Sequence, residues 1–281
     1  MTSVQHVEVL RIKKTDRESI PDLVVAEEPM EIRLGYGAEE NRQQINLAVT
    51  MRTPGNDEEL CLGFLFGEAI INSLEDVLSV KYCDELGTSE NRENVLRVEL
   101  SPSVEFDQEV LQRNFYATSS CGVCGKAAIE AIEMDCQFLG DIALEVTENL
   151  IFELPDKLRE AQQVFKYTGG LHASALFNSD GKLLGHREDV GRHNALDKLI
   201  GSSLHQKQSL SESILLLSGR ISFELVQKAA RARIPLIAAV GAPSSLAVDF
   251  AESLGITLIG FLGNEKFNIY SHPHRVVNPQ S

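Results

Sequence analysis

The feature that most constrains the fold is a regular alternation of short apolar strands and helices in the second half of the chain. The pattern predicts, in order, a strand at 214–217, a helix at 221–232, a strand at 235–240, a helix at 244–253 and a strand at 256–261. Strands joined through helices run parallel, and parallel sheets are covered on both faces. The alternation therefore predicts an α/β fold with a mixed, mostly parallel sheet that is covered by helices.

The segments before this alternation suggest a division into two domains. Residues 148–281 add a helix near 155–166 and two strands, 171–177 and 182–186, around the turn Asn178-Ser179-Asp180-Gly181. Residues 1–147 are less regular and are interpreted as a smaller α+β domain. Its expected elements are a charged, extended or frayed arm over 1–20, paired strands at 26–34 and 44–51, a helix at 57–71, strands at 77–83 and 95–100, a short helix at 107–114, and a cysteine-bearing loop followed by a helix to about 134.

That loop contains a pair of cysteines, Cys121-Gly122-Val123-Cys124. Small polar residues precede the pair, and strong helix formers with apolar residues at helical spacing follow it. The thiols are therefore expected at the start of a helix, where unpaired N–H groups and the helix dipole favour a thiolate. Lys126 adds a nearby positive charge. The pattern indicates nucleophilic sulfur chemistry.

Three other interpretations of the pair remain open. A structural zinc site needs four ligands, but the other three cysteines, Cys61, Cys83 and Cys136, are isolated in the sequence. A thioredoxin-like redox pair follows a strand, whereas a Ser/Thr-rich stretch precedes this one. A buried or disulfide-bonded pair without chemistry is the third alternative.

A second candidate site lies at the predicted carboxyl ends of the strands, where ligands bind in open α/β sheets. Ser218-Gly219-Arg220, Gly241-Ala242-Pro243-Ser244 and the loop after residue 260 follow the three strands, and each is rich in small residues. Ser244 can cap a helix N-terminus, which attracts phosphate. Ordinary turns between strands and helices would have the same composition. We predict ligand contacts from Ser218, Arg220, Ser244 and the loop residues Phe261, Leu262, Gly263, Asn264, Glu265 and Lys266.

The densest polar cluster of the chain is the run from Arg187 to Asn194, with His172 on a preceding strand. Arg192 and His193 would lie in the first turn of a helix that Asp189 could cap. A solvated helix start explains part of this pattern, but it does not explain the combination of cation, imidazole and amide beside Gly191 at a sheet edge. We therefore add His172, Arg192 and His193 to the candidate binding residues.

The charge balance restricts the ligands and partners. The net charge of −15 argues against bulk nucleic-acid binding. Residues 1–160 carry −18 and residues 161–281 carry +3, so an anionic ligand is expected in the second part. Neither a membrane-spanning apolar run nor the basic-then-apolar layout of a signal peptide is present. The expected location is the cytoplasm, with no membrane partner.

Several of these segments together resemble a known family, the formate dehydrogenase accessory proteins called FdhD. The resemblance covers nearly the whole chain after the first 20 residues. Its segments are Glu27–Pro29, Met51–Gly55, Cys121–Lys126, Thr168–Ala173, Arg187–Lys198, Ser218–Arg220, Gly241–Ser244 and Phe267–Tyr270. The chain has Gly263 where an Arg is expected in many members, which removes cofactor contacts from that side chain.

The resemblance implies that the protein is a sulfurtransferase. It also implies that the C-terminal half of the chain has a fold similar to that of cytidine deaminases. Such a protein takes persulfide sulfur from a cysteine desulfurase and passes it to the molybdenum or tungsten of a bis-molybdopterin guanine dinucleotide cofactor. The cofactor is bound as a substrate and then inserted into formate dehydrogenase. By the same resemblance, Cys121 carries the sulfur, while Cys124 assists its transfer or protects the intermediate. No resident metal is implied.

Two rival functions follow from the same segments. A zinc-dependent deaminase needs His-x-Glu and a later Pro-Cys-x-x-Cys, but His172-Ala173-Ser174 lacks the Glu and no cysteine follows Cys136. The sequence therefore argues against deamination. A non-catalytic chaperone that only holds the cofactor for formate dehydrogenase remains as the alternative. A two-fold homodimer is the expected assembly, because such dimers are the commonest oligomers and the two-pterin cofactor is pseudo-symmetric.

Overall fold

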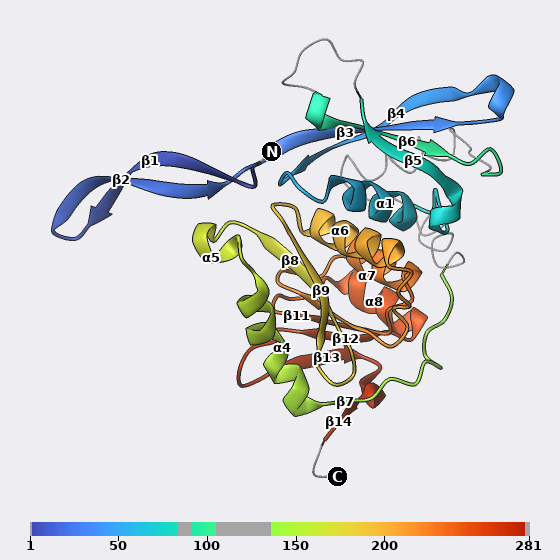
Figure 1. Ribbon diagram of the computed structural model, residues 1–281. Coiled ribbons are helices and arrows are strands. Elements are labelled where there is room, and N and C mark those ends of the chain that lie inside the picture. The colour runs from blue at the N-terminus through green and yellow to red at the C-terminus, as the bar shows by residue number, and fades with distance from the viewer. Residues whose placement is uncertain (1, 84–91, 105–135, 279–281) are drawn as a thin grey trace.

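The computed structural model describes residues 2–83, 92–104 and 136–278 and contains two sheets that each pack against helices (Figure 1). The first is a four-stranded sheet in the order β4-β3-β6-β5. Helix α1 (Asp57–Gly67) covers one of its faces, and apolar side chains from all four strands and the helix form a buried cluster. The strands are β3 (Glu28–Tyr36), β4 (Gln43–Arg52), β5 (Val77–Tyr82) and β6 (Val95–Leu100).

The second sheet has six strands in the order β13-β12-β11-β10-β8-β9. Its three central strands, β10, β11 and β12, are parallel to one another, as the alternating pattern predicts. The other neighbours pair antiparallel, so the sheet is mixed. The strands are β8 (His172–Phe177), β9 (Leu183–Asp189), β10 (Ile214–Leu217), β11 (Leu236–Ala239), β12 (Thr257–Gly260) and β13 (Asn268–Ser271).

Helices cover both faces of this sheet, because its central strands are apolar on both sides. Helices α6, α7 and α8 pack on one face through a buried cluster that includes Leu199, Val226 and Phe250. Helix α4 packs on the other face through Ile151, Leu154 and Leu158. The bounds are α4 (Glu148–Ala161), α5 (Phe165–Thr168), α6 (Arg192–His205), α7 (Phe223–Arg231) and α8 (Ser245–Leu254).

Local capping explains where several predicted helices differ from the observed ones. The helix expected near 155–166 begins earlier, because the Thr147 hydroxyl accepts a hydrogen bond from the Leu150 N–H and caps α4. Pro155 therefore lies inside α4 and not in its first turn. Gly191, and not Asp189, is the N-cap residue of α6. The helix expected over 57–71 ends at Gly67, whereas Ser244 caps α8 as predicted.

Short elements complete the described chain. The strand β7 pairs parallel with β14 near the C-terminus, and neither β13 nor β14 was expected from the sequence. Among the described residues, no helix is long and apolar enough to cross a membrane. These elements are β7 (Val146–Thr147), β14 (Val276–Val277) and the 3-10 helices η1 (Glu39–Asn41), η2 (Leu74–Asp76), η3 (Arg92–Asn94) and η4 (Pro273–Arg275).

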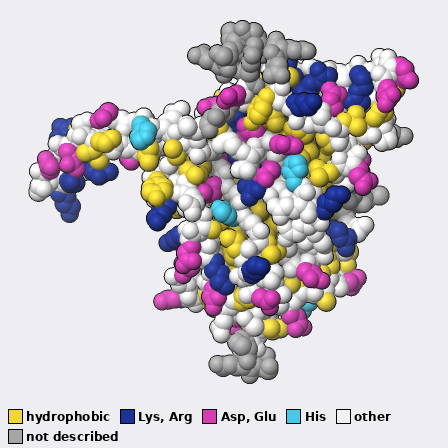
Figure 2. All heavy atoms as spheres, in the orientation of Figure 1, with side chains coloured by type: hydrophobic (Ala, Val, Ile, Leu, Met, Phe, Trp, Pro, Cys, Tyr) yellow, Lys and Arg dark blue, Asp and Glu magenta, His cyan; other side chains and the backbone are white. Residues whose placement is uncertain are grey.

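The expected N-terminal arm is a regular two-stranded ribbon. The strands β1 (Val4–Lys13) and β2 (Asp16–Val25) pair antiparallel over their whole length. The ribbon projects from the body of the molecule, and its base lies beside α5 (Figures 1 and 2).

The two sheets are joined by a close contact between helices α1 and α6, which lie one above the other (Figure 1). Glycines make this contact possible on both sides. A β-carbon at Gly63 of α1 would overlap the backbone carbonyl of Asp197, and one at Gly201 of α6 would overlap that of Glu59. The absence of side chains at these two positions lets the helix backbones touch.

Candidate functional site

The turns that the sequence singles out lie along one edge of the six-stranded sheet. Strands β10, β11 and β12 end there, β9 ends there, and β8 begins there. Backbone hydrogen bonds link one turn to the next. The Ser218 N–H donates to the Ala173 carbonyl at 3.0 Å, the Gly241 N–H to the Gly219 carbonyl at 3.1 Å, and the Phe261 N–H to the Gly241 carbonyl at 3.1 Å. The structure thus brings together segments that are 90 residues apart in sequence.

Gly241 is required by the close approach of these turns. A β-carbon at this position would lie 2.7 Å from the Gly219 oxygen and 2.8 Å from the Arg220 nitrogen. The imidazole of His172 lies over Gly219, where a β-carbon would be 3.2 Å from Nδ1. The glycines of this edge therefore let the turns and the His172 ring pack directly against one another.

Three helix N-termini meet the same edge, because α6, α7 and α8 follow the strands β9, β10 and β11. Ser244 caps α8, accepting a hydrogen bond from the Ala247 N–H at 3.3 Å. The N-cap residues of α6 and α7, Gly191 and Ser222, make no side-chain capping bond. The first turn of α6 therefore offers N–H donors and a positive dipole end to an anion, whereas Glu224 places a carboxylate in the first turn of α7.

A cavity of about 410 Å³ opens at this edge between the sheet and helix α4. Two residues predicted from the sequence, His172 and Ser218, line it. The Ser218 hydroxyl accepts a hydrogen bond from the Ala173 N–H at 2.8 Å, which fixes its position beside the cavity. The remaining lining residues are Pro155, Leu158, Arg159, Gln162, Phe165, Gly169, Gly170, Leu171 and Val240. Sequence reasoning missed those from α4, because only the tertiary fold brings them to the strand ends.

The surroundings of His172 favour the neutral form of its imidazole. Burial lowers the pKa of its imidazole, and the positive charge of Arg192 lowers it further. A neutral imidazole both donates and accepts a hydrogen bond, so His172 can contact a polar group such as a nucleobase.

His193 and Arg192 begin helix α6 beside the start of α7. The Nε2 atom of His193 lies 3.0 Å from the Ser222 hydroxyl and 3.6 Å from a carboxylate oxygen of Glu224. The hydrogen bond with His193 lowers the pKa of Glu224 to about 2. The buried Nε atom of Arg192 has no hydrogen-bond partner within the part of the chain that the structure describes. Arg192 thus retains donor capacity near the edge.

The loop over 261–266 presents most of its predicted residues to solvent. Phe261 has a positive φ of 53° and an exposed ring. The Gly263 N–H closes the loop by donating to the Lys266 carbonyl at 3.1 Å. Asn264, Glu265 and Lys266 are exposed, as is Arg220 in the neighbouring turn. Leu262 differs, because its side chain packs into the core beneath the sheet and leaves only its backbone for a ligand.

Other polar side chains of the segment 187–198 lie in the interface between the two sheets. Asp189 is buried and accepts bonds from Lys198 at 2.7 Å and from the Thr53 N–H at 3.1 Å. Asn194 donates to the Met51 carbonyl at 2.8 Å, and Arg187 pairs with both carboxylate oxygens of Glu59. These side chains hold the interface and do not face the cavity at the sheet edge.

A second buried ion pair lies in the same interface. Lys228 of α7 is 2.8 Å from Asp197 of α6 and 3.4 Å from Glu68, just beyond α1. Burial raises the pKa of Asp197 to about 6, although the Lys228 charge acts in the opposite direction.

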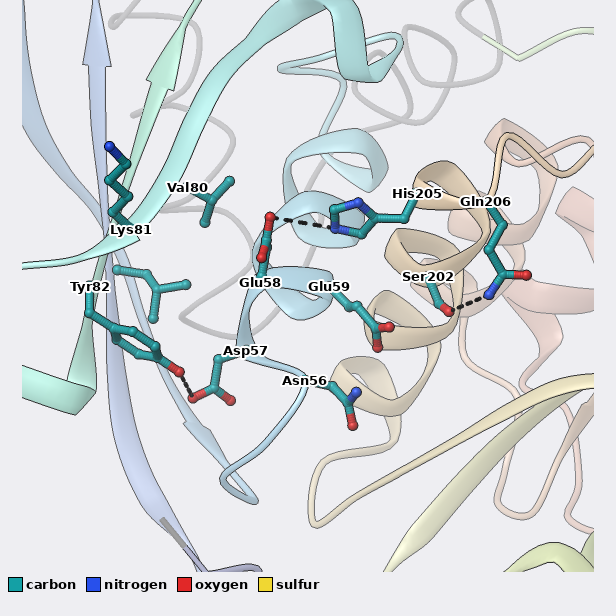
Figure 3. A pocket seen from close by; sticks show the side chains of 11 residues that line it. Asn56, Asp57, Glu58, Glu59, Val80, Lys81, Tyr82, Ser202, His205 and Gln206 are labelled. Carbon is teal, nitrogen blue, oxygen red and sulfur yellow. Dashed lines mark hydrogen bonds and ion pairs between the residues drawn. The ribbon is translucent and has the colours of Figure 1, made fainter.

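A cavity of about 590 Å³ also lies between the two halves, and several acidic side chains line it (Figure 3). Asp57, Glu58 and Glu59 enter it from the start of α1, while Ser202, His205 and Gln206 enter from α6. The Tyr82 hydroxyl donates to Asp57 at 3.1 Å, and burial together with that carboxylate raises the tyrosine pKa above its ordinary range. Arg52 pairs with Asp57 and Arg187 pairs with Glu59, so these two carboxylates of the cavity already have basic partners.

The predicted pair Cys121 and Cys124 lies outside the described residues. The three described cysteines are free thiols. Cys61 is buried in the core, and burial raises its pKa, which makes it a poor nucleophile.

Comparisons with known proteins identify the family of this chain. A model of the FdhD/NarQ family matches residues 25–277. The chain belongs to the FdhD/NarQ family. The matched residues include both cysteines of the pair and every candidate residue of the sheet edge. They exclude nearly all of the N-terminal ribbon.

Curated relatives and a solved structure agree with this assignment. Proteins named sulfur carrier protein FdhD share 47% identity over 272 residues in Streptomyces coelicolor and 50% over 260 residues in Mycolicibacterium paratuberculosis. These alignments cover 95% and 91% of this chain, and 94% and 92% of the relatives. A crystal structure from Desulfotalea psychrophila, described as a formate dehydrogenase accessory protein, superposes with a TM-score of 0.75 at 25% identity. That superposition covers 98% of this chain and all of the other.

Proposed function

We propose that this protein is a sulfurtransferase that supplies formate dehydrogenase with a sulfurated cofactor. It would take persulfide sulfur from a cysteine desulfurase in the cytoplasm and deliver it to a bound molybdenum bis(molybdopterin guanine dinucleotide), which is a substrate and not a resident cofactor. The observation that carries this proposal is the pair Cys121-Gly122-Val123-Cys124 within a family whose relatives are named sulfur carriers.

The first chemical step is a transfer between cysteines. The Cys121 thiolate attacks the outer sulfur of the desulfurase persulfide, a new S–S bond forms at Cys121, and the donor cysteine leaves as a thiolate. Lys126 and the helix start expected after the pair would favour the attacking thiolate. Cys124 then protects the persulfide or assists delivery: its thiolate attacks the Cys121 sulfur, a Cys121–Cys124 disulfide forms, and the outer sulfur leaves as sulfide for the metal.

The sheet edge is the proposed site for the guanine dinucleotide parts of the cofactor. Three features support binding of the pyrophosphate: the N-terminus of α6, the exposed Arg220, and the Nε atom of Arg192, which has no partner among the described residues. The 410 Å³ cavity beside His172 and Ser218 has the volume and the polar groups for a nucleobase.

Sulfur loading tests the first part of the proposal. The purified protein is incubated with a cysteine desulfurase and radiolabelled cysteine, and mass spectrometry locates the added sulfur. We expect a sulfur adduct on the 121–124 peptide, lost in Cys121→Ala and retained in the control Cys83→Ala. Undiminished labelling of Cys121→Ala would refute the carrier role, and loss in Cys124→Ala alone would reassign it to Cys124.

Nucleotide binding tests the second part. Titration calorimetry with GDP, which mimics half of the dinucleotide, is expected to show about tenfold weaker binding to Ser218→Ala/Arg220→Ala. Lys182→Ala is the matched control, because this exposed residue follows β8 at the opposite edge of the sheet. Equal affinity of all three proteins, also after changes in the 261–266 loop, would exclude this edge.

A sulfurtransferase and a non-catalytic chaperone predict different outcomes in cells, and the sulfurtransferase prediction is as follows. A strain carrying only Cys121→Ala/Cys124→Ala should assemble formate dehydrogenase with cofactor present but without activity, because nucleotide binding does not need the thiols. Full dehydrogenase activity in that strain would mean that the thiols are bystanders and that the protein acts as a chaperone.

A further inference from the structure

The four-stranded sheet has an outer face, the one that points away from α1, and this face carries a row of three basic side chains. Arg33 on β3 is the register partner of Arg97 on β6, and Arg97 is the register partner of Lys81 on β5. Their neighbours along the strands, such as Ile32 and Val98, are buried against α1, so side-chain alternation places the three cations on the outer face. Figure 2 shows Lys and Arg side chains gathered over this sheet.

Such a row is unfavourable for the sheet by itself. Neighbouring strands lie about 4.8 Å apart, so each cation has a like charge directly beside it, and like charges in opposed positions destabilise a sheet. An alternation of acidic and basic residues across the strands would neutralise the face without any ligand. A surface that instead keeps three cations in register attracts anions from solution.

Two carboxylates of the same face neutralise only part of the positive charge. Glu31 pairs with Arg33 at 3.0 Å, and Glu99 is shared between Arg97 and Arg42. With Lys81, this group has four basic and two acidic side chains, so two positive charges remain. They remain in the acidic part of the chain, since residues 1–160 together carry −18.

The hydrogen bonds show which donors of the group stay available. Arg42 is fully used, because its terminal nitrogens also donate to the carbonyls of Gly35 and Gly37. Arg97 bonds to Glu99 through Nε, and its two terminal nitrogens have no partner among the described residues. Lys81 is exposed and has no ion-pair partner in the described part of the chain. The free donors therefore lie on the two adjacent strands β5 and β6.

A cavity of about 260 Å³ opens at the row, and all three of its cations line the cavity. Gln44, Ser79 and the free thiol Cys83 also line it. One carboxylate, that of Glu99, is present, and it is already paired with Arg42. Guanidinium groups bind carboxylate and phosphate through two parallel hydrogen bonds, so the terminal nitrogens of Arg97 fit either group.

We propose that this cavity binds a small polyanion, a molecule that carries at least two carboxylate or phosphate groups. One anionic group would lie between Arg97 and Lys81 and another beside Arg33, because the row of three spans about 10 Å. The bound charge would offset the repulsion within the row. The proposal is independent of the sulfur chemistry and of the sheet-edge site, which lies in the other half of the chain.

Titration calorimetry at constant low salt tests binding with two probes, citrate for carboxylates and inorganic pyrophosphate for phosphates. We expect at least one probe to bind, and Lys81→Met/Arg97→Met to weaken that binding at least about tenfold, because hydrogen bonds to charged groups are the strong ones. Lys14→Met/Lys182→Met is the charge-matched control, since it removes two exposed cations elsewhere and should leave the affinity unchanged. Failure of both probes to bind, or equal weakening in the two double variants, would overturn the proposal.

Alkylation of Cys83 identifies which site the probe occupies. A bound anion should shield this thiol from the neutral reagent iodoacetamide, so its alkylation, measured by mass spectrometry, should slow when the probe is added. Cys136 lies outside the cavity and should react at an unchanged rate. The shielding should be lost in Lys81→Met/Arg97→Met and retained in Ser218→Ala/Arg220→Ala, so that failure of this site and failure of the sheet-edge site give different results. Binding without shielding of Cys83 would overturn the proposal.

The stability of a single variant separates a binding role from a structural one. Lys81→Met removes one cation from the row without breaking a described ion pair, so the urea midpoint of the ligand-free protein should stay the same or rise. The same variant should still weaken probe binding, which keeps the test valid if the double variant does not fold. A lower midpoint together with unchanged probe affinity would mean that Lys81 supports the sheet and not a ligand, and would overturn the proposal.

Discussion

The edge of the six-stranded sheet and the interface between the two halves take polar side chains from the same part of the sequence but use them differently. At the interface, Asp189 and Lys198 are buried and paired with each other. At the edge, the Nε atom of Arg192 has no partner among the described residues, and Arg220 is exposed. Paired buried charges contribute to holding the structure together, whereas unpaired donors remain available to a ligand.

The two regions control two properties that can be measured independently, the stability of the fold and the affinity for a ligand. Substitutions at the interface should change the free energy of unfolding, because they leave buried groups without partners. Substitutions at the edge should change ligand affinity with little effect on stability.

The largest expected effect is that of Lys198→Met at the interface. This change leaves the Asp189 carboxylate buried without its charge partner and removes the bond to the Thr53 carbonyl at 2.7 Å. We expect a loss of about 3–5 kcal/mol in the free energy of unfolding, measured by urea denaturation. Arg220→Met at the edge is the control, with an expected change within about 0.5 kcal/mol. Similar losses in both variants would remove the distinction between the two regions.

A pH-dependent effect is expected from Asp197. Its pKa is about 6 in the folded protein, against an ordinary value near 4 in the unfolded chain. Between pH 4 and 6 the folded state binds the extra proton, so the free energy of unfolding falls as the pH rises through this window. The contribution is at most about 3 kcal/mol for a shift of this size.

Urea denaturation at several pH values measures this slope. Asp197→Asn should remove it, whereas Asp180→Asn, at an exposed turn residue, should leave it unchanged. An unchanged slope in Asp197→Asn would mean that the carboxyl group keeps an ordinary pKa despite its burial.

The backbone contact between α1 and α6 predicts a steric effect. Gly63→Ala would place a methyl group on the Asp197 carbonyl, so the helices must separate. We expect a loss of about 1–3 kcal/mol in the free energy of unfolding. Gly185→Ala is the matched control, since its nearest neighbour would be an ordinary contact at 3.8 Å with Leu199. Equal stability of the two variants would show that the interface tolerates a wider spacing.

The smallest expected effect is at His172, on the edge. His172→Gln should change the free energy of unfolding by no more than about 0.5 kcal/mol. Because the histidine pKa is lowered, the ring gains a proton only at acidic pH and then adds a positive charge to the site. GDP binding by the wild type should therefore improve relative to the variant at pH 5, roughly threefold or less because of solvent screening. A constant affinity ratio between pH 5 and 8 would place His172 outside the site.

Several parts of the fold and the site could be predicted because their causes are local. The strands β10, β11 and β12 are continuous apolar runs, and the cap at Ser244 depends on residues within one turn of its helix. The order of these strands then brings their carboxyl ends to one edge. Leu262 was predicted as a contact of the ligand, but alternation along the chain gave no indication that its side chain points into the core.

The ribbon and the polar run show why other features could not be predicted. Residues 1–20 are rich in charged side chains, so the sequence predicts an extended or frayed arm. The pairing of β1 with β2 buries no face of the ribbon, and the sequence therefore carries no apolar pattern from which the pairing could be predicted. In the run 187–194, Arg187 and Arg192 have the same chemistry in the sequence. Glu59, more than 100 residues away, pairs with Arg187, whereas the Nε atom of Arg192 has no partner in the described chain.

The sequence by itself determined the α/β character of the second half and the family of the chain, because apolar periodicity and residue type act over short distances. The tertiary structure alone decided which polar residues hold α1 against α6 and which remain at the sheet edge. The reason is physical: whether a charged side chain stabilises the fold or serves a ligand depends on the partner that lies beside it. That partner usually comes from a distant segment, as Glu59 and Thr53 do for Arg187 and Lys198.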